Sequence, residues 1–260
     1  MYNLGKVFGL LILLTVLGSC SDDEGSLSSG NGNSQNLNNR STGASANELL
    51  SETTYTNLII EAVYVDGFRP EASSLNNLVS FLDSRLNKSG GISIIERDIP
   101  AQPYDTYTIE EVRQVEDEFR TQFSSGNTIA VFVLFAENAS ASDSGNNVVL
   151  GTAYRNTSLV MYQSTIENFS GGLNQPNRVT VETAVYAHEF CHIMGLVNLG
   201  TPLTSQHEDP DNDKHCNVAN CLMQAQLESG NIFDMMSALG SGVPNLDAQC
   251  IADLQANGGK

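Results

Sequence analysis

The stretches HEFCHIMG, residues 188–195, and HCNVANCLM, residues 215–223, decide how this chain is expected to fold. Apolar residues recur through the segment before and within the first stretch, which predicts one long helix over Val179–Met194. His188 and His192 are four residues apart and therefore project from one face of that helix. The chain has four histidines, and all of them fall between residues 188 and 215, so its imidazoles are concentrated in this region.

This pattern indicates a zinc site that can hydrolyse a bond. Neutral imidazoles bind Zn²⁺, and a catalytic site has three protein ligands and an open position for a water, whose pKa the ion lowers to about 7. Glu189, next to the first histidine, is placed to take a proton from that water. Gly195 tolerates the positive φ of a sharp helix end, so the chain can turn back towards the metal with a third ligand.

The two stretches together resemble the signature of metzincin zinc metallopeptidases, HExxHxxGxxH followed by a methionine turn. The second stretch is similar to the archaemetzincin branch, in which the third histidine is followed by Cys, four residues, Cys, one residue and Met. His215-Cys216, Cys221 and Met223 keep that order and spacing. The roles that the resemblance implies are zinc ligand for His188, His192 and His215, general base of a peptidase for Glu189, and packing beneath the metal for Met223.

The chain departs from this pattern at the third ligand. Asn198 stands where the family has its third histidine, and His215 follows after an apparent insertion, Asn198–Lys214. The insertion contains His207, a competing ligand. The spacing of eight residues to Met223 favours His215. The further alternatives for the third ligand are Asn198 itself, Glu208 and Glu228.

The cysteines predict disulfides. Cys216 and Cys221 are close in sequence and form the first expected pair, and Cys191 with Cys250 would form the second. An alternative is a structural zinc held by Cys216, Cys221 and Cys250, which lacks a fourth thiol. Archaemetzincins complete such a second zinc site with a downstream CxxC, but this chain has Cys250 alone in that region, which favours the Cys216–Cys221 disulfide.

The amino-terminal residues predict export and lipid anchoring. Lys6 and the apolar run Val7–Leu17 are typical of a signal peptide over residues 1–19, and the run is too short to span a bilayer. Residues 17–20, Leu-Gly-Ser-Cys, resemble a bacterial lipobox, which implies that Cys20 is acylated and held in a membrane. The alternative is an ordinary secretory signal. The acidic residues 21–24 resemble the signal for the outer face of the outer membrane, so we expect a lipoprotein of the bacterial cell envelope, exposed at its surface.

The remaining chain predicts a tether and one domain. Residues 20–50 are rich in Ser, Asn and Gly and predict a flexible tether. The order of the expected elements predicts an α/β (α+β) domain over residues 51–260, with a twisted mixed sheet, one antiparallel edge strand and the metal-binding helix over 51–195 and a small C-terminal subdomain over 196–260. The resemblance implies that this domain is a metallopeptidase of metzincin-like zincin type. The expected strands are 58–65, 92–95, 128–135, 148–154 and 158–162.

Charge limits the partners. The formal net charge of −18, from 12 basic and 30 acidic residues, excludes nucleic acid, which is bound by neutralising phosphates with Lys and Arg. The resemblance to metzincins implies a peptide or protein substrate, bound along the antiparallel edge strand near residues 148–154. Asp209, Asp211 and Asp213 alternate like the start of a Ca²⁺ loop, but the required glycine and distal glutamate are missing, which favours a solvated loop.

Overall fold

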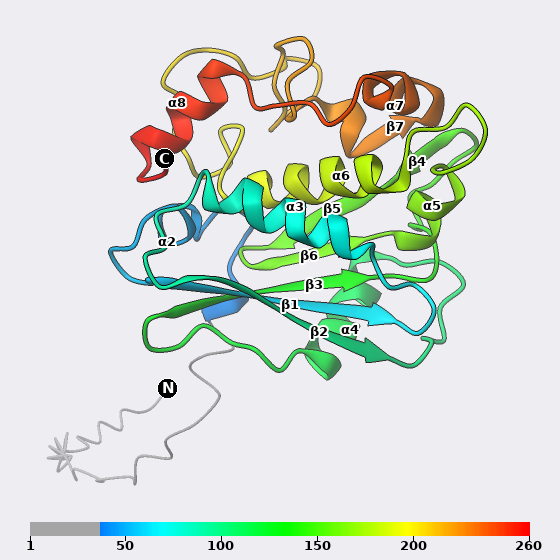
Figure 1. Cartoon of the computed structure of the whole chain (residues 1–260), viewed down its shortest axis with the longest axis horizontal. Coiled ribbons are helices and arrows are strands. Elements are labelled where there is room, and N and C mark those ends of the chain that lie inside the picture. Colours follow the sequence, from blue (N-terminus) through cyan, green and yellow to red (C-terminus); the bar gives the residue numbers. More distant parts are fainter. Residues whose placement is uncertain (1–36) are drawn as a thin grey trace, which may run out of the picture. The chain divides into compact units, whose positions relative to one another are not determined.

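The computed structural model describes residues 37–260, which form an α/β domain around a five-stranded mixed sheet (Figure 1). Across the sheet, the strands are β2 (Gly91–Ile99), β1 (Asn57–Val65), β3 (Thr128–Phe135), β6 (Ser158–Met161) and β5 (Gly151–Arg155). The first four are parallel, and β5, at the edge, runs antiparallel to β6. The prediction of a mixed α/β sheet with one antiparallel edge strand is confirmed.

Helices cover both faces of the sheet, as Figure 1 shows: α3 (Ala72–Asp83) and α6 (Arg178–Ile193) on one face, and α4 (Ile109–Phe119) on the other. Alternate residues of β3 therefore enter two different cores. Ile129, Val131 and Val133 pack on the side of α3 and α6. Phe132 and Leu134 pack on the side of α4. Burial on both faces explains why this strand is continuously apolar.

The C-terminal part packs on the side of α6 that faces away from the sheet (Figure 1). Its elements are the short helix η1 (Ala225–Leu227), the strand β7 (Ser229–Asn231) and the helices α7 (Ile232–Leu239) and α8 (Ala248–Ala256). The strand β7 pairs with β4 (Asn147–Val149) in a small antiparallel sheet. α6 is thus enclosed between the main sheet and this part, and every residue of Val181–Ile193 is buried.

Three local expectations differ from the structure. The strand expected over 148–154 is two strands, because the chain changes partner at Leu150: its N–H donates to the carbonyl of Glu228 at 2.8 Å, and its carbonyl accepts from the N–H of Tyr162 at 2.9 Å. The helices α5 (Gln163–Asn168) and α7 were not anticipated. The sequence favours Asn245 as the cap of the last helix, but α8 is capped by Asp247, whose side chain accepts from the N–H of Gln249 at 2.7 Å.

The tether expected over 20–50 is wrong for its final part, residues 37–50. The helix α2 (Ala46–Leu50) buries Leu49 and Leu50 in the main core. The buried ammonium of Lys88 donates to the carbonyl oxygens of Glu48 at 2.8 Å and Tyr55 at 2.7 Å, and to that of Ser51. Leu49, Leu50 and the ammonium of Lys88 therefore hold this segment against the domain. Its polar composition had predicted a flexible tether.

The predictions for the amino terminus concern residues outside the described range: the signal peptide over 1–19, the acylated Cys20 and the tether from 20 to 36. Within residues 37–260, no helix is long and apolar enough to cross a membrane.

Candidate metal centres

The helix α6 positions the first two imidazoles. It begins at Arg178, after Asn177, whose side-chain oxygen accepts from the N–H of Val179 at 2.8 Å. His188 and His192 lie one turn apart on the enclosed part of the helix, where both are buried. A buried helix holds its side chains in one rotamer each, so this pair is a rigid half of the site.

The turn that ends α6 requires glycine. Gly195 has a φ of +87°, and a Cβ at this position would lie 2.5 Å from the nitrogen of Thr201 and 2.6 Å from its hydroxyl oxygen. That hydroxyl donates to the carbonyl of Met194 at 2.7 Å. The turn leads into the insertion, residues 198–214, which brings His215 back to the helix.

Backbone carbonyls orient three imidazoles. The Nδ1 atoms of His188, His192 and His215 lie 2.7 Å from the carbonyl of Leu222, 3.0 Å from that of Leu196 and 3.0 Å from that of Asp213. We assign the proton to Nδ1, because a carbonyl only accepts. The lone pair of each ring is then on Nε2, the atom that binds a metal when the other nitrogen is held by an oxygen.

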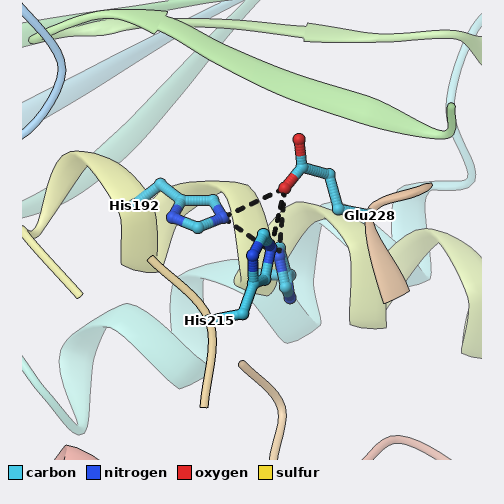
Figure 2. A group of neighbouring side chains, drawn as sticks. His192, His215 and Glu228 are labelled. Atoms are coloured by element: carbon cyan, nitrogen blue, oxygen red, sulfur yellow. Dashed lines mark hydrogen bonds and ion pairs between the residues drawn. The ribbon is translucent and has the colours of Figure 1, made fainter. Parts of the chain in front are cut away.

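The three Nε2 atoms converge. Those of His188 and His192 are 3.1 Å apart, and the ring of His215 stacks on that of His188 at 5.3 Å between centroids. Figure 2 shows the carboxylate of Glu228 facing the same point, and its Oε2 is 2.9 Å from Nε2 of His215. The four donor atoms lie within 4.8 Å of one another. Three imidazoles and a carboxylate are ligands that Zn²⁺ takes in proteins, so the residues fit that ion.

The protonation of the site suits a metal. Burial is the main cause that lowers the pKa of His188 to about 4, and the imidazole is therefore neutral at pH 7, as a ligand must be. The site thus presents three imidazole nitrogens and one carboxylate.

Glu189 is a buried carboxylate that the protein leaves unsatisfied. Among residues 37–260, neither of its oxygens has a hydrogen-bond partner. Burial first, and the negative charge of Glu228 second, raise the pKa of Glu189 well above its usual range. A buried polar group without a partner destabilises the fold, and such groups in native proteins are typical of catalytic positions.

Of the other sequence candidates for the third ligand, Glu228 lies in the site, and Asn198, Glu208 and His207 lie elsewhere. Asn198 donates to the carboxylate of Glu208 at 2.8 Å, and the same carboxylate accepts from the N–H of Lys214 at 2.9 Å. Both residues therefore fix the insertion. His207 is fully buried in a second cluster. Met223 is fully buried in the main core, and its carbonyl accepts from the N–H of Cys216 at 2.7 Å.

The second cluster gathers thiols around an imidazole. Nδ1 of His207 is 3.3 Å from Sγ of Cys216 and 3.9 Å from Sγ of Cys250, and the latter is 3.8 Å from Sγ of Cys221. On its other side, Nε2 of His207 contacts the buried carboxylate of Asp253 at 2.7 Å. The sequence suggested the three thiols as zinc ligands but not His207 in this role, because His207 lies inside the insertion, nine positions before Cys216.

The predicted disulfides are wrong. The four cysteines in the described part of the chain, Cys191, Cys216, Cys221 and Cys250, are buried free thiols. A disulfide places its sulfurs about 2.05 Å apart, whereas sulfurs that share a tetrahedral Zn²⁺ at about 2.3 Å are about 3.8 Å apart. The Sγ atoms of Cys221 and Cys250 are 3.8 Å apart, which matches the separation of two sulfurs that share a zinc ion. Hydrogen bonds with Cys216 and Cys250 lower the pKa of Cys221, and hydrogen bonds among the same three thiols raise the pKa of Cys216 and Cys250, so the three sulfurs titrate as one coupled group.

A cleft of about 280 Å³ opens beside the first centre. It is lined by His192, His215, Glu228, Thr42, Ala153, Leu199, Asp213 and Lys214. Ala153 belongs to the edge strand β5, which packs against α6. Substrate that enters this cleft therefore meets the imidazoles and an edge of the sheet together.

No protein-family model and no curated protein matches the chain. The structure is similar to that of archaemetzincin from Methanopyrus kandleri, with a TM-score of 0.49 and 15% identity over 78% of this chain and 96% of that chain. It is also similar to metalloproteinase-II from Bacteroides fragilis, with a TM-score of 0.43 and 14% identity over 79% of this chain and 54% of that chain.

Proposed function

We propose that the protein is a zinc metallopeptidase of metzincin type. The observation that carries this proposal is the convergence of three Nε2 atoms, from His188, His192 and His215, beside the partnerless carboxylate of Glu189. A structural zinc site would not require a base next to its ligands. A hydrolytic site requires one, and burying it without a partner costs stability that only a function offsets.

In this proposal the side chains at the site have separate roles. His188, His192 and His215 hold the ion, which when bound supplies Lewis acidity and an acidified water. Glu189 accepts a proton from water and delivers it to the leaving amine, and its raised pKa favours holding that proton between the two steps. The enclosed walls around α6 exclude bulk water from this proton transfer.

The edge strand supports a peptide substrate. β5 has one partner in the sheet, β6. On its other edge the carbonyl of Ala153 accepts from the hydroxyl of Thr42 at 3.2 Å, a contact that a pairing peptide would replace. An extended peptide in the cleft can add to that edge by main-chain hydrogen bonds, which holds the scissile bond in one register. We propose cleavage within extended segments of peptides or proteins.

The decisive experiment measures zinc content and peptide cleavage together. Glu189→Gln keeps the shape of the side chain and removes the base, so zinc content should be unchanged and cleavage should fall by about 10²–10⁴-fold. Arg69→Gln, an exposed substitution on an ion pair with Glu96, serves as the control and should leave both unchanged. A zinc-loaded wild type that cleaves no member of a broad peptide library would instead favour a peptide-binding protein.

The donor atoms of His207, Cys216, Cys250 and Asp247 lie within 4.8 Å of one another. We also propose that this second cluster holds a structural zinc through His207, Cys216 and Cys250, with Cys221, whose Sγ is 3.8 Å from that of Cys250, as the fourth ligand in place of Asp247. Three sulfurs and one imidazole nitrogen form a closed ligand set without a place for water. Asp253 orients the imidazole, which is the usual arrangement around a zinc-bound histidine. This ion would connect three segments that are separate in sequence: the insertion through His207, residues 215–223 through Cys216 and Cys221, and α8 through Cys250.

Membrane attachment is a separate proposal, which the resemblance of residues 17–20 to a lipobox supports. Acylation of Cys20 would place the peptidase on the bacterial cell envelope. Incorporation of labelled palmitate into the wild type, and its loss in Cys20→Ser, tests this. An unlabelled wild type would contradict it.

A further inference from the structure

The carboxylate of Glu228 occupies the corner of the metal site where a water would have to bind. Its Oε2 lies 2.9 Å from Nε2 of His215, 3.3 Å from that of His192 and 3.8 Å from that of His188. Ligands held about 2.05 Å from a tetrahedral Zn²⁺ are about 3.3 Å apart. The three nitrogens and this oxygen therefore have the mutual spacing of a complete set of four ligands (Figure 2).

Four protein ligands close a zinc site, whereas a site that hydrolyses a bond keeps one position for water. This site has a closed ligand set, and it also has a buried base, Glu189. A base can act there only when a water binds the metal, and four protein ligands leave no position for that water. We propose that Glu228 is the fourth metal ligand of the resting protein, and that a peptide substrate must displace its carboxylate. The inference rests on the proposed function, because it concerns the same centre.

Backbone hydrogen bonds alone hold the main chain of Glu228 in place, so its side chain is not needed for that. Its N–H donates to the carbonyl of Ala225 at 3.1 Å, and its carbonyl accepts from the N–H of Leu150 at 2.8 Å. The side chain is 20% exposed and lines the cleft beside His192 and His215. A change of rotamer can therefore carry the carboxylate from the metal to solvent while the main chain stays in place.

The position of Glu228 explains how a bound peptide could displace its carboxylate from the metal. Leu150, which binds its carbonyl, is the residue between β4 and β5, and β5 borders the cleft through Ala153. A peptide that pairs with β5 fills the space next to this carboxylate. Substrate thus competes directly with Glu228, which reduces apparent affinity by the fraction of molecules in the open state.

The test compares wild type with Glu228→Ala and Glu228→Gln, and uses Asp234→Asn as the control, an exposed carboxylate in the first turn of the adjacent helix α7. Zn²⁺ affinity is measured by competition with a chromophoric chelator. Each protein is then loaded with Co²⁺, and its visible spectrum is followed during titration with azide, an anion that binds a metal only where a position is free. Circular dichroism shows whether each variant is folded.

We expect Zn²⁺ affinity to fall at least tenfold in Glu228→Ala, and the control to match the wild type. The Co²⁺ spectrum of the wild type should resist azide at concentrations that change the spectrum of Glu228→Ala. In cleavage assays, Glu228→Gln should show a KM several-fold lower than that of the wild type. If the alanine variant is unfolded, the glutamine variant decides the spectroscopic comparison in its place.

An azide response in the wild type equal to that of the variants overturns the inference, whatever the affinities. Zn²⁺ affinities that are equal in wild type and variants overturn it as well. Failure of the proposed function looks different: the zinc-loaded wild type and all variants would then cleave nothing, while azide binding and Zn²⁺ affinity would still show whether Glu228 is a ligand.

Discussion

Gly151 lies directly against the side chain of Glu189: a Cβ built on this glycine would be 2.7 Å from Cγ and 3.0 Å from Oε1 of the glutamate. Gly151→Ala should therefore displace the proposed base and leave the imidazoles in place. Because a misplacement of about 1 Å can cost about 10²-fold in rate, we expect kcat/KM to fall by about that factor with unchanged zinc content. Gly240→Ala, where a Cβ meets nothing closer than 3.4 Å, is the matched control.

The two loop histidines should have separable effects on metal content. Wild type should bind about two zinc ions, and His215→Ala and His207→Ala about one each, because each removes a ligand from a different centre. In the Co²⁺-loaded proteins, thiolate-to-cobalt charge-transfer absorption should persist in His215→Ala and be lost in His207→Ala. The opposite pattern would exchange the assignments of the two histidines.

Asp253→Asn should weaken the second centre only. The Asp253 carboxylate contacts His207 and also accepts from the N–H and the hydroxyl of Thr204, both at 2.6 Å. Loss of a carboxylate that orients a zinc-bound histidine lowers metal affinity by about 10–100-fold. Zinc affinity of the thiol cluster, measured by chelator competition, should fall by this factor. An unchanged affinity would show that His207 is not a ligand.

Lys88→Met should destabilise the fold although it removes a buried charge. The ammonium donates to three backbone carbonyls that would lose their partner. We expect the free energy of unfolding at pH 7 to fall by about 2 kcal/mol in urea denaturation. Lys260→Met, at a surface lysine that donates to the carbonyl of Asp83, should change it by less than about 0.5 kcal/mol.

The stabilising effect of Lys88 should depend on pH. Burial lowers its pKa from 10.5 to about 8, so between these two pH values the unfolded chain binds more protons than the folded one. The contribution of this residue to stability therefore rises as pH increases from 8 to 10.5. The difference in unfolding free energy between wild type and Lys88→Met should be larger at pH 10 than at pH 7.5, and a smaller difference would contradict the pKa shift.

Periodicity predicted the layers of the fold but not the partners of every strand. The run at 128–135 and the helix before His188 were correct because burial imposes a pattern on sequence directly. The change of partner at Leu150 was missed, since one apolar run is compatible with one strand or two. The segment 37–50 was misjudged because its composition is polar, while its fixation depends on Lys88, almost forty residues away.

Sequence spacing also identified the helical part of the first candidate metal site. His188, Glu189 and His192 are one turn of helix, so local geometry places them together. The thiols were predicted as disulfides because four cysteines outside the cytoplasm usually pair. Their gathering around His207 depends on the path of the insertion, which no local pattern encodes. Glu228 was considered only as a third ligand, and its place as a fourth donor required the coordinates.

His215 and Cys216 are neighbours in the chain but face different centres. If both centres hold zinc, a single peptide bond joins a ligand of one ion to a ligand of the other. An ion in the thiol cluster would then hold the backbone next to His215 in place and so support the geometry of the imidazole centre.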